Sequence, residues 1–267
     1  MDDQATQPTT QPQDDTRRHG SNSRLSKQDE TDVVVLLHPS SPAAFVAVDL
    51  TADAAPQHIQ QNHDQSYIED TSDTELEGTS ITSKNAKDIA LRLSSRVNDI
   101  RMGFIFGRNT SRSDILLVRD IPKGTVEPDP RFAVSNKHFR IYVNHNGIVM
   151  LEDISTNGTI VDNIVLHGPK APDQSANHQP KTTLAQGSVI EVPISGGGDS
   201  IRFIVGLPDR YEGSKKYGEN LGEYLSCVQQ AERKTAAIAK AVAKKEKVPS
   251  DVPVSRICIS ILKFGVD

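Results

Sequence analysis

The chain has 267 residues, of which 36% are hydrophobic and 4% aromatic, and it contains no tryptophan. This composition is thin for a protein packed along its whole length, so we expect one ordered domain with disordered or weakly ordered flanks. The net charge of −5 argues against a general nucleic-acid binder, which needs a basic surface.

Membrane, export and metal-binding patterns are missing from the sequence. No apolar run approaches the ~20 residues that a membrane helix needs, and the N-terminus has no basic region followed by an apolar one. The two cysteines, Cys227 and Cys258, lie far apart and in no ligand-like spacing. We therefore expect a soluble intracellular protein with no metal site, no cofactor and no membrane partner.

The first 85 residues are predicted to be mostly disordered. Residues 1–32 are rich in Asp, Gln, Thr and Ser, and residues 51–85 form a polar, acidic linker. Such segments bury too little apolar surface to offset the entropy of ordering them. Between them, a continuous apolar run, a Pro-Ser-Ser-Pro turn and an alternating apolar segment predict a short β-hairpin over residues 33–50.

Residues 86–207 have the pattern of an all-β domain. Apolar and polar side chains alternate along many short segments, without helical periodicity. An Asn-Gly pair within residues 144–147 is a strong hairpin signal. Strands are predicted at 89–93, 104–107, 114–118, 139–143, 148–151, 159–166, 188–192 and 201–205. The pattern indicates a β-sandwich or barrel, with residues 167–183 as a long inserted loop.

Three short signatures follow one another inside this region. They are Gly107-Arg108, then Ser135-Asn136-Lys137-His138, then Thr156-Asn157-Gly158-Thr159. In this order and spacing, on strand-like sequence, they resemble the forkhead-associated (FHA) domain, a module that binds phosphothreonine peptides. The likeness is greatest to the FHA domains of fungal DNA-damage checkpoint serine/threonine kinases. It covers residues 86–207 and implies a sandwich of two twisted sheets.

Five signature residues are the candidate contacts to a phosphopeptide. A phosphothreonine presents about two negative charges and three acceptor oxygens, so its site needs a cation with directed donors. The resemblance implies that Arg108 and Ser135 contact the phosphate and that Asn136 or Thr156 adds further donors. It also implies that Asn157 bonds the peptide main chain, a task that suits an amide because an amide both donates and accepts.

The remaining signature residues are expected to support the site. Gly107 and Gly158 are predicted to take backbone conformations that a Cβ would hinder. The resemblance implies that His138 braces the binding loops through hydrogen bonds. Catalysis by His138 as a base beside Ser135 is the weaker interpretation, because no motif places an acid and the other signatures would go unexplained.

Two further residues, Arg131 and Lys137, are candidates for peptide specificity. In a yeast checkpoint-kinase FHA domain, an Arg two residues before the Ser helps to select an acidic residue three positions after the phosphothreonine. That position is Ala133 here, and Arg131, four residues before Ser135, is the candidate replacement. The preference at this peptide position therefore stays open.

The N-terminal region contains two Thr-Gln pairs, Thr6-Gln7 and Thr10-Gln11. Damage-response kinases phosphorylate such pairs, and the checkpoint kinases that the chain resembles carry clusters of them beside the FHA domain. The resemblance thus implies phosphothreonine-containing partner proteins, a nuclear location and a role in checkpoint signalling. Phosphorylation-dependent self-association through Thr6 or Thr10 stays open, because neither has an acidic residue three positions later. Chance Thr-Gln pairs in a polar tail are the alternative.

Residues 208–267 form a tail with two open interpretations. Apolar side chains at helical spacing and abundant alanine over residues 217–247 predict an amphipathic helix. By resemblance, the same stretch looks like the opening strands of a protein kinase. Leu221-Gly222 would start its glycine-rich loop, and Ala237-Ile238-Ala239-Lys240 would replace its Val-Ala-Ile-Lys strand.

Catalytic kinase motifs are absent from the sequence. Without His-Arg-Asp and Asp-Phe-Gly, phosphoryl transfer would lack its base and its magnesium site. We therefore expect a phosphothreonine-binding interaction module that is not an enzyme. One alternative is a fragment of an FHA-containing kinase whose catalytic domain is missing. Another is an FHA-like sandwich that has lost peptide binding.

Overall fold

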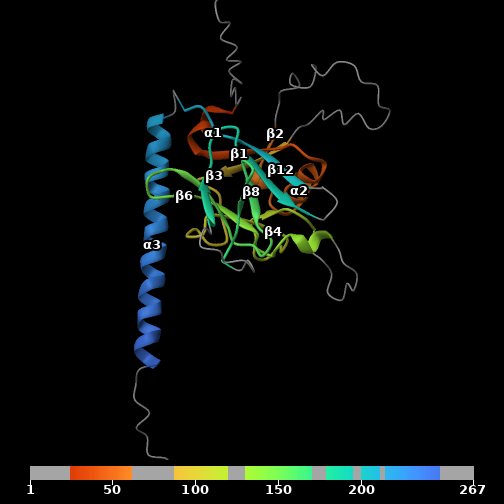
Figure 1. The fold of residues 1–267 in the computed structure, drawn as a ribbon. Helices are drawn as coiled ribbons and strands as arrows, with labels where there is room; N and C mark the ends of the chain where they lie inside the picture. Colours follow the sequence, from red (N-terminus) through yellow and green to blue (C-terminus); the bar gives the residue numbers. More distant parts are fainter. Residues whose placement is uncertain are drawn as a thin grey trace, which may run out of the picture.

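Two β-sheets packed face to face form the body of the protein, and a long helix lies beside them (Figure 1). The computed structural model describes residues 25–61, 87–119, 130–169, 179–194, 200–210 and 214–246. The predicted fold class, a sandwich of two sheets with a partly helical C-terminal tail, is confirmed. Most of the N-terminal region predicted to be disordered lies outside the described residues.

The larger sheet has seven strands in the order β2-β3-β1-β12-β11-β8-β9, and all its neighbours are antiparallel. Its strands are β1 (Val33–Pro39), β2 (Ile59–Gln61), β3 (Lys87–Arg92), β8 (Thr159–Val161), β9 (Ile164–Leu166), β11 (Val189–Pro193) and β12 (Ser200–Gly206). Asp162 and Asn163 adopt positive φ angles of 50° and 65°. The stretch predicted as strand at 159–166 is therefore a tight hairpin of two strands.

The smaller sheet has five strands in the order β10-β7-β6-β4-β5, of which only β4 and β5 are paired in parallel. Its strands are β4 (Phe104–Gly107), β5 (Ile115–Leu116), β6 (Phe139–Val143), β7 (Val149–Asp153) and β10 (Lys181–Thr183). The predicted turn between β6 and β7 is present, with Gly147 at φ +77°. The prediction of a loop over residues 167–183 is wrong at its end, because residues 181–183 form β10 and pair with β7. Residues 170–178 of this loop lie outside the described ones.

The inward faces of the two sheets supply one hydrophobic core. Phe106 of β4 and Phe139 of β6 stack with their ring centroids 4.5 Å apart. Both are fully buried, as are Phe203 and Leu37 of the larger sheet. Each such side chain stabilises the fold by about 1.5–3 kcal/mol. The core thus fixes the end of β4 and the start of β6, next to which two of the three signatures lie.

The hairpin predicted over residues 33–50 is wrong in its second half, where α2 (Pro42–Ala54) forms instead. Ser41 caps this helix by accepting a hydrogen bond from the backbone N–H of Ala44, and a proline occupies its first turn. Its buried positions have helical spacing and are Ala44, Ala47, Val48 and Thr51. Val46 is 58% exposed. The apolar alternation on which the predicted second strand depended, at Val46, Val48 and Leu50, is therefore a coincidence within a helix.

Strand β1 extends the sandwich to residues before the predicted boundary at 86. It pairs with β3 on one side and with β12 on the other, so it lies inside the sheet rather than at its edge. The short helices α1 (Lys27–Asp32), η1 (Pro56–His58) and η2 (Pro130–Ala133) complete the described body.

Helix α3 (Ser214–Glu246) confirms the helical interpretation of the tail. Its first half packs against the core through Tyr217, Leu221, Tyr224, Leu225 and Val228. Its second half extends past the body, with Ile238 and Val242 exposed (Figure 1). The stretch compared with kinase strands is thus one continuous helix, and no strand forms within residues 214–246.

Candidate functional site

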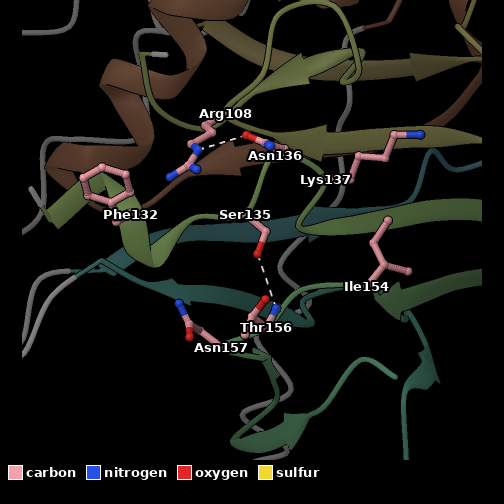
Figure 2. A pocket seen from close by; sticks show the side chains of 8 residues that line it. All are labelled: Arg108, Phe132, Ser135, Asn136, Lys137, Ile154, Thr156 and Asn157. Carbon is pink, nitrogen blue, oxygen red and sulfur yellow. Dashed lines mark hydrogen bonds between the residues drawn. The ribbon is translucent and has the colours of Figure 1, made fainter. Parts of the chain in front are cut away.

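Sheet register brings the three sequence signatures to one end of the smaller sheet. Phe106 of β4 pairs with Phe139 of β6, and Phe139 pairs with Asp153 of β7. The loop after β4, the loop before β6 and the loop after β7 must therefore meet. They enclose a pocket of about 380 Å³ that is shown in Figure 2. Its lining residues are Arg108, Phe132, Ser135, Asn136, Lys137, Ile154, Thr156 and Asn157.

Arg108 is held in this pocket from two sides. Its Nε donates to Oδ1 of Asn136 at 3.0 Å, and its guanidinium carbon lies 5.1 Å from the ring centroid of Phe132. Its Nη1 is buried and has no hydrogen-bond partner among the described residues. A buried donor without a partner costs free energy comparable to a lost hydrogen bond. The pocket therefore contains a cation that is held on two sides and has one hydrogen-bond donor left unsatisfied by the described residues.

The hydroxyl and amide groups of the pocket are also oriented by hydrogen bonds. The backbone N–H of Thr156 donates to Oγ of Ser135 at 3.3 Å, which leaves the hydroxyl proton of Ser135 unused in that contact (Figure 2). Nδ2 of Asn157 donates to the carbonyl oxygen of Ala133 at 2.9 Å. Both contacts join the loop before β6 to the loop after β7, so the two walls of the pocket are tied together.

His138 lies beneath these loops and is fully buried. Its Nδ1 accepts from the backbone N–H of Ser135 at 3.0 Å, and its Nε2 donates to the carbonyl oxygen of Gly158 at 3.1 Å. These contacts require the neutral tautomer with the proton on Nε2. Burial lowers the pKa of His138, while the charge of Asp153 and the bond to Gly158 oppose this shift. The ring is thus a neutral bracket between two loops.

A second buried network supports the loop after β7. Oδ1 of Asp153 accepts from the hydroxyls of Ser155 at 2.9 Å and Thr159 at 2.7 Å. Oγ of Ser155 in turn accepts from the backbone N–H of Gly158 at 2.7 Å. Sequence reasoning missed Asp153 and Ser155, although both lie beside the third signature. The signal in the sequence was that both residues are polar and stand close to the end of a strand predicted to be buried.

Gly107 and Gly158 each occupy a position that a side chain would disturb. A Cβ on Gly107 would overlap the carbonyl oxygen of Asn136 and lie 2.7 Å from Oγ of Ser113. Gly158 has φ +89°, a left-handed conformation that favours glycine. A Cβ there would also lie 2.8 Å from the carbonyl oxygen of Leu166. The first glycine permits close packing of two loops, and the second permits a turn.

The five predicted contact residues all line this one pocket, together with Lys137. Arg131, the other candidate for specificity, does not line it. Two lining residues, Phe132 and Ile154, were missed by sequence reasoning. Neither belongs to a polar signature, and single apolar residues in loops have no periodicity that marks them.

Metal-binding clusters and membrane-spanning helices do not occur in the described part of the chain. Within it, no group of three or more His, Cys, Asp or Glu side chains is placed to hold a metal ion. No helix there is long and apolar enough to cross a bilayer.

In the comparison with known proteins, residues 104–192 match the family model of the FHA domain. No curated protein matches the chain. Similar solved structures include the N-terminal FHA domain of S. cerevisiae Rad53p in complex with a phosphothreonine peptide. That match has 25% identity, covers 40% of this chain and 69% of the other, and has a TM-score of 0.28.

Two further structures show the same likeness. An engineered FHA with a Myc-pTBD peptide is 24% identical, with 48% of this chain and 88% of the other covered and a TM-score of 0.30. The FHA1 domain of yeast Rad53, solved by NMR, is 18% identical, with 80% and 94% covered and a TM-score of 0.35.

Proposed function

We propose that this chain, which carries an FHA domain at residues 104–192, binds other proteins through their phosphothreonine residues. The observation that carries the proposal is the buried Nη1 of Arg108, a pocket-lining residue, which has no partner among the described residues. A dianionic phosphate supplies the acceptor oxygens that this donor lacks. Guanidinium–phosphate hydrogen bonds are among the strongest in proteins because both groups are charged.

The neighbouring donors fit the same phosphate. The hydroxyl of Ser135 and the exposed side chains of Asn136 and Thr156 line the same pocket as Arg108. Lys137 adds a second cation to the lining. One Arg, one Lys and several neutral donors together match two negative charges without an excess of positive charge.

Asn157 is proposed to bind the peptide main chain. Its Nδ2 is bonded to Ala133 in the described structure, and its side chain remains exposed at the rim. Exchanging this intramolecular bond for bonds to a peptide would let one amide group both donate and accept. This exchange gives a role to the exposed amide of Asn157, which lines the same pocket as Arg108.

We propose binding without catalysis. The imidazole of His138 bonds to the backbone N–H of Ser135 and to the carbonyl of Gly158, not to the hydroxyl of Ser135. A general base must reach the proton that it removes. Both ring nitrogens are already engaged in structural bonds, and this supports the bracing role rather than a nucleophile–base pair.

The cellular context is part of the proposal and rests on the sequence resemblance. It comprises phosphothreonine-containing partner proteins, a nuclear location and DNA-damage checkpoint signalling. Self-association through phosphorylated Thr6 or Thr10 would require a site that accepts peptides without an acidic residue at the third position, since neither threonine has one there. No direct contact with nucleic acid or membrane is proposed.

The test is binding of the full chain to an oriented phosphothreonine peptide library, followed by fluorescence anisotropy with selected peptides. We expect micromolar affinity, about −8 kcal/mol. Arg108→Ala should weaken binding by about 30-fold or more, because it removes a charged partner of the phosphate. Arg202→Ala is the matched control, because Arg202 lies on β12 in an ion pair with Glu191. A folded wild-type chain that binds no phosphopeptide would overturn the proposal.

A further inference from the structure

One end of the pocket is aromatic. Phe132 is 48% exposed and lies on η2, immediately before the loop that carries Ser135. Figure 2 shows its ring at one end of the pocket, with Lys137 and Ile154 at the opposite end and Arg108 between them. A peptide laid across the pocket with its phosphate at Arg108 would therefore pass over the Phe132 ring on one side only.

The backbone around Phe132 is anchored by the η2 turn and by the core. Val134 is fully buried in the core, and its N–H donates to the carbonyl of Arg131 at 3.1 Å. An exposed aromatic ring on an anchored backbone offers apolar surface with little entropy to lose on binding.

The chemistry at this end is apolar rather than cationic. Arg131 does not line the pocket, and Arg108 is assigned to the phosphate position. The guanidinium carbon of Arg108 lies 5.1 Å from the Phe132 centroid. An extended peptide advances about 3.3 Å per residue, so a side chain within about three residues of the phosphothreonine reaches the ring.

We propose that Phe132 determines specificity by contacting an apolar side chain that flanks the phosphothreonine, so that the partner sites are phosphothreonines with an aliphatic or aromatic residue on that flank. This inference rests on the proposed function. It names the peptide class that the site takes and favours an apolar flank over the acidic one that a cation in place of Ala133 would select.

The test uses the full chain and phosphothreonine peptides in which each of the three positions on either side carries Leu, Ala or Asp in turn. We expect one position at which Leu is preferred to Asp by about tenfold, since burying an aliphatic side chain contributes enough for that ratio. Phe132→Ala should reduce the ratio to below about threefold. Phe132→Tyr should retain it, because the ring is kept.

The ratio of affinities for the Leu and Asp peptides distinguishes two roles of Phe132: direct contact with the peptide, and stacking on Arg108 alone. Loss of the Arg108 stacking would weaken all peptides alike and leave the Leu-to-Asp ratio unchanged. Ile148→Ala is the matched control, since Ile148 is 44% exposed and lies outside the pocket. Phosphopeptide binding without an apolar preference, or with a wild-type ratio in Phe132→Ala, would overturn this inference alone. A wild-type chain that binds no phosphopeptide would overturn the proposed function as well.

Discussion

The imidazole Nδ1 of His138 accepts a hydrogen bond of 3.0 Å from the backbone N–H of Ser135, three residues earlier. The opposite ring nitrogen donates to the carbonyl of Gly158 in the loop after β7. A single buried ring therefore sets the distance between the two walls of the pocket. Ser135 keeps its hydroxyl directed to the pocket because its backbone is fixed from below.

His138→Ala should impair both stability and peptide binding. It leaves the Ser135 N–H and the Gly158 carbonyl buried without partners, which costs about 1–3 kcal/mol for each group. We expect urea unfolding to show a loss of about 2–6 kcal/mol and peptide affinity to fall at temperatures where the variant is still folded. Unchanged affinity in the folded variant would mean that the loops keep their positions without the ring.

Gly107→Ala should displace the loop that carries Asn136. The added Cβ would meet the backbone of Asn136 rather than a flexible side chain, so the strain cannot be relieved by a rotamer change. We expect a destabilisation of about 1–3 kcal/mol and a loss of phosphopeptide binding.

Gly222→Ala provides the control for this substitution. Gly222 lies in α3, and a methyl group added there would meet no atom within 4 Å among the described residues. A helical Gly→Ala change stabilises by roughly 0.5–1 kcal/mol. The two melting temperatures should therefore shift in opposite directions. A rise in melting temperature for Gly107→Ala would contradict the close approach of the two loops.

Acid should destabilise the fold through His58. This side chain is buried beside Phe104, and burial, followed by the charge of Arg92, lowers its pKa to about 4. The unfolded chain takes up this proton near pH 6.5, and the folded chain only near pH 4. The contribution of His58 to the free energy of unfolding is therefore fully present above about pH 6.5. It falls between about pH 6.5 and 4, by about 1.4 kcal/mol per pH unit for one proton.

Chemical denaturation across this pH range measures the effect. His58→Leu should reduce the slope by the contribution of one proton, while the lowered pKa of His138 adds its own contribution in the same direction. An identical slope in His58→Leu would show that His58 does not titrate differently in the folded and unfolded chains.

A fragment limited to residues 86–207 should not fold stably. It lacks β1, whose five buried side chains are Val33, Val34, Val35, Leu36 and Leu37. At about 1.5–3 kcal/mol each, their loss matches or exceeds the roughly 5–15 kcal/mol that stabilises a typical domain. Circular dichroism and heteronuclear NMR of this fragment and of residues 25–246 provide the comparison. A cooperative melt of the shorter fragment would contradict the prediction.

Strands β6, β7 and β12 were predictable because only one face of each is buried, as in β6, where Phe139, Ile141 and Val143 alternate with partly exposed residues. The clustering of the candidate site residues in one pocket was predictable because they occur in short contiguous signatures. Helix α2 was not predicted, because its small apolar residues also satisfy a two-residue alternation. The available signal for a helix was Ser41 followed by a proline, a common start of a helix.

Contacts between residues that are far apart in the sequence could not be predicted from local sequence patterns. The position of β1 depends on pairing with β12, and the bonds of Asp153 depend on the turn that brings Thr159 back to it. Phe132 gave no signal because an exposed loop aromatic becomes meaningful only once Arg108 is found beside it.

The central place of β1 has a consequence for biosynthesis. The hydroxyl of Ser40, at the end of β1, bonds to the carbonyl of Arg202, 162 positions later. At about 5–20 residues per second, the ribosome needs roughly ten to thirty seconds to deliver that partner. Until then, the Val-Val-Val-Leu-Leu run has an unpaired edge, a known template for aggregation. The nascent chain is therefore a natural client for chaperones that shield apolar strands before β12 emerges.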